Sequence, residues 1–241
     1  MIIESISNER VKNWIKLHQK KYRDESNLFL CEEEHLINEA LAKGIVKTII
    51  IRSDSEDIFK FKDTVLVTNT IMDKLSTNVS RVKYIGVCSK IEETFKPDKR
   101  VLLLDRVQDP GNLGTLIRSA VSFGYNQIVC SLDCVDVYNE KTIRATQGAL
   151  FYANIIKMDL STCIDCLKQE GFMVVSLALN NSIDLKDLKP SEKMAFILGN
   201  EGSGISKEII LKSDVSAKIT MKEFESLNVS IAGSIAMYSF M

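Results

Sequence analysis

The sequence predicts an α/β fold in both halves of the chain, and two observations support that prediction. Short apolar segments typical of buried strands alternate with segments of helical period along the chain. Apolar strands that alternate with helices are typical of parallel sheets covered on both faces. With 241 residues and 45% hydrophobic content, the chain is long enough to form the cores of two modest domains or of one large domain.

A polar segment separates the two halves. Residues 91–100, IEETFKPDKR, combine seven polar or charged side chains with Pro97 and have no clear period. This composition predicts a linker, with one domain over residues 1–95 and a second over residues 96–241.

Each predicted element follows from local composition and period. In the first half we expect helices over 7–22 and 33–43 and strands over 27–31, 47–53, 64–69 and 83–89, with short helices between strands. In the second half we expect strands over 101–105, 127–132, 152–158, 172–179, 194–199 and 216–221, most of them followed by helices.

The charge and composition exclude some classes of protein. Lys+Arg 31 against Asp+Glu 32 gives a net charge of -1, so any nucleic-acid site must be local. No apolar run approaches the roughly 20 residues of a membrane helix, and the start of the chain does not resemble a secretory signal. We therefore expect a cytoplasmic protein without a membrane partner.

The six cysteines lie mostly in apolar stretches, where we expect buried, reduced thiols. The spacing of Cys130 and Cys134, together with that of Cys163 and Cys166, leaves a zinc site open as an alternative. The second pair lies in STCIDCLKQEG, which is typical of a surface helix rather than a zinc knuckle. We expect no metal.

Ligands of parallel α/β sheets bind beyond the carboxyl ends of the strands, and three loops at such positions are unusual. In the first, residues 109–112 (DPGN) are strong turn formers, and Thr115 is an expected cap for the next helix. Arg118 then falls in the first turn among apolar residues, where a guanidinium needs an anionic partner or must reach solvent.

The second loop, GNEGSG at 199–204, matches neither the Walker phosphate loop nor the dinucleotide fingerprint. Glu201 would repel a phosphate seated on these amides, which favours a neutral or cationic ligand. Two alternatives stay open: the carboxylate holds Arg118, or the segment is an ordinary tight turn before a helix.

The third loop precedes a helix that is apolar or small on every side. Ser226 is the expected N-cap, and Asn228 is expected in the first turn as a buried amide that needs partners. Such a helix should be buried against another helix or a second subunit.

Together, NLGTLIRSA, ILGNEGSGIS and SLNVSIA, in this order, resemble the three motifs of the TrmH/SpoU family within the SPOUT methyltransferases. The resemblance covers the C-terminal half and implies an α/β trefoil-knot domain, a homodimer and bound S-adenosylmethionine. It also implies methyl transfer to a ribose 2'-hydroxyl of RNA. A cofactor with a sulfonium and no phosphate would explain the carboxylate in the glycine loop.

The motifs carry family roles to particular positions. The resemblance implies cofactor contacts from Ala178, Leu198, Gly199, Ile219, Met221, Leu227 and Asn228. It implies catalytic or site-fixing roles for Asn112, Arg118, Glu201, Ser226 and Asn228. Because a guanidinium hardly ever gives up its proton, we expect Arg118 to stabilise the developing alkoxide or hold the adjacent phosphate, and to lie buried beside the pocket.

The N-terminal segment resembles the L30e/L7Ae-like substrate-recognition domain that often precedes this catalytic domain. Lys12, Lys16 and Lys20 share a helical face, with Arg23 close behind, which predicts a local contact with RNA phosphates or a solvated face. The chain departs from the family pattern in three places: Glu33 stands where glycine is common, SRVKYIG lacks the usual Gln-Gly, and Thr220 replaces a proline.

The function predicted from these observations is RNA ribose 2'-O-methylation, with rRNA preferred over tRNA because of the two-domain layout. The alternatives are a tRNA methyltransferase and a non-catalytic RNA-binding protein of the same fold. A nucleotide-dependent oxidoreductase is disfavoured, because the chain lacks the required glycine pattern.

Overall fold

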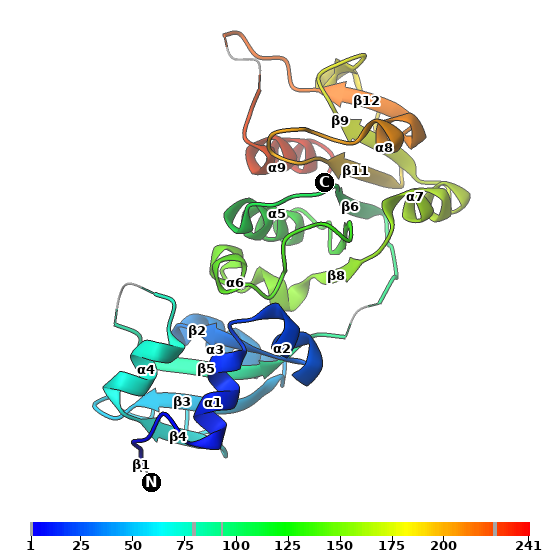
Figure 1. Cartoon of the computed structure of the whole chain (residues 1–241). Helices are drawn as coiled ribbons and strands as arrows, with labels where there is room; N and C mark the ends of the chain where they lie inside the picture. The colour runs from blue at the N-terminus through cyan, green and yellow to red at the C-terminus, as the bar shows by residue number, and fades with distance from the viewer. Residues whose placement is uncertain (1, 79–80, 93, 224–225) are drawn as a thin grey trace. The chain divides into compact units, whose positions relative to one another are not determined.

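The computed structural model describes residues 2–78, 81–92, 94–223 and 226–241, and its contacts divide the chain into two compact units (Figure 1). One unit runs to Glu92 and also includes residues 138–151; the other comprises residues 94–137 and 152–241. The predicted linker begins near this division, although its residue 93 lies outside the described residues. The sequence did not indicate that residues 138–151 pack with the first unit.

The first unit contains a five-stranded sheet with the strand order β1-β4-β3-β5-β2. Its elements are β1 (Ile2–Ile3), α1 (Glu9–Lys16), α2 (Lys20–Ser26), β2 (Leu28–Glu32), α3 (Glu34–Ala42), β3 (Val46–Arg52), β4 (Thr64–Val67), α4 (Asn69–Leu75), β5 (Tyr84–Ser89) and α6 (Glu140–Thr146). The prediction of a parallel sheet is wrong for this half, since β5 runs antiparallel to both β2 and β3. An apolar strand signals burial on both faces, but it carries no information about strand direction.

The helix predicted over residues 7–22 is in fact two helices, because α1 ends at Lys16 and α2 begins at Lys20. Asn8 caps α1, and its side chain accepts a hydrogen bond from the backbone N–H of Arg10. The buried face of α1 contributes Trp14 to the core of this unit, and Leu17 in the break is also buried.

Glu33, at the N-cap of α3, adopts φ 79° and ψ 139°. Glycine adopts this backbone conformation without strain, whereas a residue with a Cβ pays about 1–3 kcal/mol. The departure from the family pattern noted at this position therefore places a glutamate on a glycine-type backbone.

The second unit contains a seven-stranded sheet with the order β10-β12-β9-β11-β6-β7-β8, and all its recorded pairs are parallel, as predicted. Its elements are β6 (Arg100–Leu104), α5 (Pro110–Ser122), β7 (Gln127–Cys130), η1 (Ala149–Tyr152, shared with the first unit), β8 (Asn154–Lys157), α7 (Leu160–Gln169), β9 (Met173–Leu177), β10 (Ile183–Asp184), η2 (Leu185–Asp187), β11 (Met194–Leu198), α8 (Lys207–Lys212), β12 (Val215–Lys218) and α9 (Val229–Ser239).

The register of the central strands aligns their carboxyl ends. Leu198 of β11 pairs with Leu104 of β6, and Leu104 pairs in turn with Cys130 of β7. The loops that follow these strands therefore emerge at one edge of the sheet, as expected for a ligand-binding edge.

Helix α9 returns to the sheet and packs on α5 and β11 (Figure 1). Gly233 permits this approach, because a Cβ there would lie 2.5 Å from Leu198 and 2.6 Å from Leu116. The expected packing of α9 against another helix is confirmed by its contacts with α5, while Ile231 and Tyr238 stay 52% and 60% exposed in the single chain.

Two helices begin at residues other than the predicted caps. The N-cap of α5 is Asp109, not Thr115, and its side chain accepts the N–H of Asn112 at 2.8 Å. The N-cap of α9 is Asn228, not Ser226. In both cases an Asx residue closer to the true helix start supplies the cap.

All six cysteines are free, and five of them are buried, as predicted for reduced thiols. In the described part of the chain no group of three or more His, Cys, Asp or Glu side chains is arranged to hold a metal ion, so the zinc alternative has no support there. Among the helices described, none has the length and apolarity needed to cross a membrane.

Candidate cofactor-binding and catalytic site

A cavity of about 750 Å³ opens at the carboxyl edge of the seven-stranded sheet. Its walls are the segments that follow β9, β11 and β12 and the start of α9. It brings together the seven predicted cofactor contacts: Ala178, Leu198, Gly199, Ile219, Met221, Leu227 and Asn228. The predicted catalytic residues that also line it are Asn112, Glu201, Ser226 and Asn228.

Gly199 is the residue at which β11 turns into the glycine loop. A Cβ at this position would lie 2.2 Å from the backbone carbon of Gly204 and 2.2 Å from the backbone nitrogen of Ile205. No side chain fits at this position, so the backbone at the start of the loop lies directly against the backbone at its end, along the cavity wall.

Asn200 holds the loop closed. Its backbone exchanges two hydrogen bonds with Gly204, at 3.1 and 3.0 Å. Its side-chain Oδ1 accepts the N–H groups of Gly202 and Ser203, each at 3.0 Å. Asn200 was not among the predicted site residues. An asparagine two residues before a glycine, shortly after an apolar strand, is a sequence signal of such an Asx turn.

The carboxylate of Glu201 ties the glycine loop to the loop that follows β6. Its Oε1 accepts the N–H of Asp109 at 3.0 Å and the side-chain amide of Asn112 at 3.1 Å, and its Oε2 accepts the N–H of Gln108 at 3.2 Å. Partial burial raises the pKa of Glu201, but these hydrogen bonds outweigh it and leave the pKa below its ordinary value. Within a single chain Glu201 does not hold Arg118, because the partners of this carboxylate in the described residues are neutral.

A second link joins these loops to α9. The side-chain amide of Asn228 donates to Oδ1 of Asn112 at 2.9 Å. Oδ1 of Asn228 accepts the N–H and the hydroxyl of Ser230, at 2.9 and 2.6 Å. A hydrogen-bonded chain therefore runs from Glu201 through Asn112 and Asn228 to the start of α9, although Asn228 is exposed rather than buried as expected.

Arg118 does not lie where the sequence predicted. Helix α5 begins at Pro110, so Arg118 falls in its third turn, and its side chain is exposed. It is not among the described residues that line the cavity. The expectation of a buried guanidinium beside the pocket is wrong for a single chain, and a catalytic role for Arg118 stays a prediction.

Two residues directly after β6, which were not among the predicted site residues, also hold the glycine loop. The carboxylate of buried Asp105 accepts the N–H of Ser206, the N-cap of α8, at 2.7 Å. Arg106, at φ 57°, donates to the carbonyl of Gly204 at 3.2 Å, and its own carbonyl accepts the amide of Asn200. A charged pair directly after an apolar strand is the signal that could have identified them.

The predicted RNA-binding residues of the first unit do not all reach the surface. Lys12 and Lys16 are exposed, and Lys20 is exposed within an ion pair of its own helix. Arg23 is only 3% exposed and donates to the backbone carbonyl of Leu17 at 2.7 Å. The expectation that Arg23 offers its charge to RNA is therefore wrong, because the guanidinium stabilises the break between α1 and α2.

The lining of the cavity fits the cofactor that the resemblance implies. Apolar side chains such as Leu198 and Ile219 offer contacts to a nucleoside, and the carboxylate of Glu201 favours a ligand with positive charge. Lys207 and Lys218 also line the cavity and suit the carboxylate of an amino-acid moiety. S-adenosylmethionine combines these three features.

Comparisons with known proteins agree with this site. The SpoU rRNA Methylase family matches residues 99–238, and the MRM3-like substrate binding domain matches residues 8–83. The 23S rRNA (guanosine(2553)-2'-O)-methyltransferase RlmP of Bacillus subtilis is 36% identical over 98% of this chain and 97% of its own.

Solved structures of similar proteins cover nearly the whole chain. The S-adenosylmethionine-bound rRNA methyltransferase of Sinorhizobium meliloti matches with a TM-score of 0.88 and 27% identity, over 99% of this chain and 96% of its own. The SpoU methyltransferase AviRb of Streptomyces viridochromogenes, at 21% identity and a TM-score of 0.86, shares the fold.

The fold and the site thus define an RNA methyltransferase of the SPOUT class with an N-terminal substrate-binding domain. More narrowly, the chain belongs to the SpoU rRNA methylase family. The class predicted from the sequence, an S-adenosylmethionine-dependent RNA ribose 2'-O-methyltransferase, is confirmed by this membership.

Proposed function

We propose that the chain methylates a ribose 2'-hydroxyl of large-subunit rRNA and acts as a homodimer. The observation that carries the proposal is the hydrogen-bonded chain from Glu201 through Asn112 to Asn228, which joins three loops around one cavity. The rRNA target is supported by the family match and by the B. subtilis relative, whose name specifies 23S rRNA. Such a target implies a cytoplasmic location.

The residues of the site bind and orient the reactants. When bound, S-adenosylmethionine would supply an electrophilic methyl carbon to the ribose 2'-oxygen, with the thioether S-adenosylhomocysteine as leaving group and the hydroxyl proton released to solvent. Gly199 and Leu198 would hold the cofactor through backbone and apolar contacts, while Glu201 and Asn112 fix the loop that faces it. Most of the rate gain comes from this positioning.

Arg118 would act on the RNA side of the reaction. Its side chain is exposed and has no hydrogen bond or ion pair with the described residues, so its charge is available to a ligand. A guanidinium stabilises a developing alkoxide or holds the adjacent phosphate without losing its proton.

Dimerisation would bring Arg118 of one subunit to the cofactor-binding cavity of the other. Next to Arg118 in α5, Ser119 hydrogen-bonds Ser234 of α9 at 2.7 Å, and α9 leaves Ile231 and Ile235 exposed at 52% and 39%. An apolar face of this kind on a packed helix is typical of a subunit interface. A second copy seated on α9 would cover it and would enclose the neighbouring guanidinium.

The first test is the activity itself. Isothermal titration with S-adenosylmethionine, followed by methyl transfer to unmodified 23S rRNA and to tRNA, separates the alternatives. We expect heat of binding and incorporation into 23S rRNA. Incorporation into tRNA alone would favour the tRNA enzyme, and absence of both signals would favour a non-catalytic RNA-binding protein. Mapping of ribose methylation in RNA from a deletion strain would identify the nucleotide.

The second test concerns Arg118 and the dimer. Arg118→Ala should abolish turnover while cofactor binding survives. If the two subunits share each site, mixing Arg118→Ala with inactive Glu201→Gln should restore about a quarter of wild-type activity, because half the dimers are mixed and each regains one site. Undiminished methylation by Arg118→Ala would refute the assignment. Sedimentation of a single 27.1 kDa species at micromolar concentration would overturn the dimer.

A further inference from the structure

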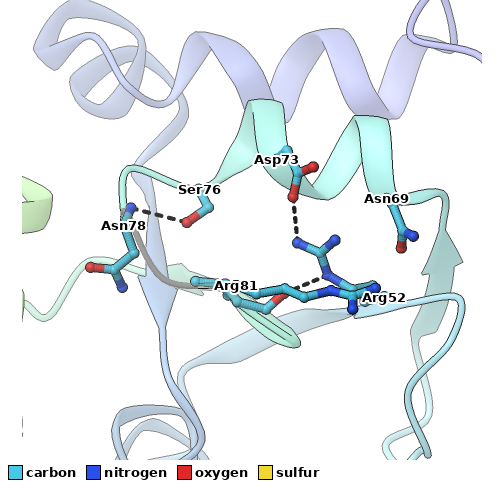
Figure 2. A pocket seen from close by; sticks show the side chains of 7 residues that line it. Arg52, Asn69, Asp73, Ser76, Asn78 and Arg81 are labelled. Atoms are coloured by element: carbon cyan, nitrogen blue, oxygen red, sulfur yellow. Dashed lines mark hydrogen bonds and ion pairs between the residues drawn. The ribbon is translucent and has the colours of Figure 1, made fainter.

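The first unit contains a cavity of about 470 Å³ that the methyl-transfer site does not use (Figure 2). It lies between α4, the last residue of β3 and the segment that leads from α4 to β5. Asn69, Asp73 and Ser76 are spaced by four and three residues and line it from one face of the α4 segment. Arg52 and Arg81 line it from the opposite side.

Arg52 is the buried anchor of this cavity. Its side chain is only 3% exposed, while its partner Asp73 is 64% exposed. Nε of Arg52 donates to the carbonyl of Val82 at 2.7 Å, and Nη2 donates to Oδ1 of Asp73 at 2.5 Å. Burial of a guanidinium is costly unless its donors are satisfied.

The guanidinium nevertheless keeps donors for a ligand. Nη1 of Arg52 makes no hydrogen bond to a described residue, yet no fully buried side-chain nitrogen or oxygen among those residues lacks a partner. Nη1 is therefore accessible to solvent, and Arg52 is one of the residues that line the cavity. One carboxylate oxygen of Asp73, Oδ2, is likewise not engaged by Arg52.

The other groups around the cavity are also polar and partly unused. The side-chain amide of Asn69 has no hydrogen bond with the described part of the chain, and Nδ2 of Asn78 is free to donate because only its Oδ1 is engaged, by Arg144. Arg81 is 62% exposed at the rim and pairs with Asp54. The cavity thus offers cationic donors next to one carboxylate acceptor.

We propose that this cavity binds an unpaired guanosine of the substrate RNA, with its base on the Arg52–Asp73 pair and its phosphate near Arg81. The inference rests on the proposed function, since the cavity lies within residues 8–83, which match a substrate-binding domain. An inorganic anion is a poorer occupant, because Asp73 would repel it. Proteins read RNA sequence through unstacked bases whose edges they hydrogen-bond, and a pocket with both donors and an acceptor suits a base.

Guanine is the base whose edges match this pair best. Its O6 and N7 accept from a guanidinium, which is the commonest specific contact of arginine with a base. Its adjacent N1–H and N2–H groups offer two donors to a single carboxylate. Uracil offers one donor beside its carbonyl, so the same pocket would hold it less tightly.

The test is fluorescence anisotropy of the full chain with labelled single-stranded hexaribonucleotides: UUUUUU, UUUGUU and UUUAUU. We expect the guanosine hexamer to bind about tenfold more tightly than UUUUUU. Asp73→Asn should reduce this preference to within about twofold, while affinity for UUUUUU is kept. Arg81→Gln should weaken binding of all three hexamers alike, as loss of a phosphate contact does.

Lys62→Gln is the matched control, since it removes one exposed positive charge of the same unit outside the cavity. It should keep the guanosine preference. Thermal denaturation of each variant checks the fold, and Asp73→Asn is preferred to a change at Arg52 because Asp73 is largely exposed.

Equal affinity of the wild-type chain for the three hexamers, a preference for adenosine, or a guanosine preference kept by folded Asp73→Asn would overturn the proposal. The anisotropy assay reports binding and not catalysis, so a failure to methylate rRNA would not change the measured preference for guanosine. Equal affinities for the three hexamers, together with methylation of 23S rRNA, would overturn the proposed guanosine site but leave the proposed methyltransferase function supported.

Discussion

Substitution of Gly199 by alanine should disable cofactor binding. The added Cβ would lie 2.2 Å from two backbone atoms, of Gly204 and Ile205, where ordinary contact begins at 3.4 Å. The overlap of about 1.2 Å falls on backbone that cannot rotate away, so one side of the loop must move. Overpacking costs about 1–3 kcal/mol, and we expect the upper end of that range.

Two other glycines of the same loop provide matched controls. At Gly204 a Cβ would meet no atom within 4 Å, but φ is 68°, so alanine should cost about 1 kcal/mol of backbone strain. At Gly202 the nearest atom, Oδ1 of Asn200, lies at 3.7 Å and φ is not positive, so alanine should be tolerated within about 0.5 kcal/mol.

The assay is isothermal titration with S-adenosylmethionine, combined with urea denaturation of each variant. If the native loop is required for binding, a cost of about 3 kcal/mol at Gly199 weakens affinity by about 100-fold. The expected order of damage is Gly199→Ala, then Gly204→Ala, then Gly202→Ala. Wild-type affinity in Gly199→Ala, or equal losses in Gly199→Ala and Gly202→Ala, would refute the reasoning.

Three further predictions concern stability. Hydrogen bonding to Glu140 raises the pKa of His18. Protonated His18 should therefore stabilise the first unit below about pH 6.5, and this stabilisation should be lost as pH rises through the folded-state pKa. Comparison of the melting temperatures of His18→Gln and the wild type across this pH range checks it. Partial burial raises the pKa of Glu201, but hydrogen bonds lower it more. Ionised Glu201 should therefore stabilise the folded state above about pH 4.3, and this stabilisation should be lost in acid. Urea denaturation of Glu201→Gln should show no such pH-dependent contribution to the free energy of unfolding. Glu33→Gly should raise the melting temperature by relieving about 1 kcal/mol of strain, and an unchanged or lower value would contradict the strain assigned at φ 79°.

The parts of the fold that sequence could predict are those set by local composition. The strand over Met194–Leu198 is apolar throughout and ends at glycine, and the structure places it at the centre of the sheet. The residues of the cavity could be predicted because loops that follow parallel strands share one edge and because three motifs resemble a known family. Both signals are carried by short, contiguous segments.

The features that sequence could not predict depend on contacts between distant segments. Residues 138–151 pack with the first unit through the contact of Tyr138 with Phe29, at 4.8 Å between ring centroids, and through the pair of Glu140 with His18. Local patterns predict elements that contain Phe29 and His18, but they carry no information about which distant residues these two side chains contact. The antiparallel direction of β5 likewise depends on the path of the chain between strands, and the hydrophobic period of a strand carries no information about that path.

The misplacement of Arg118 has a simple physical origin. Thr115 was the expected cap, but Asp109 with Pro110 behind it starts the helix six residues earlier, so Arg118 falls in the third turn rather than the first. The buried face of α5 carries Leu116, Ile117 and Ala120, and Arg118 lies outside it. Apolar neighbours in sequence do not imply burial on a helix, because successive residues point about 100° apart.

The exposure of the Arg118 side chain is related to the way in which the carboxylate of Glu201 is hydrogen-bonded. Glu201 accepts hydrogen bonds from Asp109, Gln108 and Asn112, which use both of its oxygens. These neutral donors fix the glycine loop without enlisting a cation. Had Arg118 supplied that contact, its charge would have been neutralised and held away from RNA. With the carboxylate already hydrogen-bonded by neutral groups, the guanidinium of Arg118 stays unpaired among the described residues, as its predicted role toward a phosphate or a developing alkoxide requires.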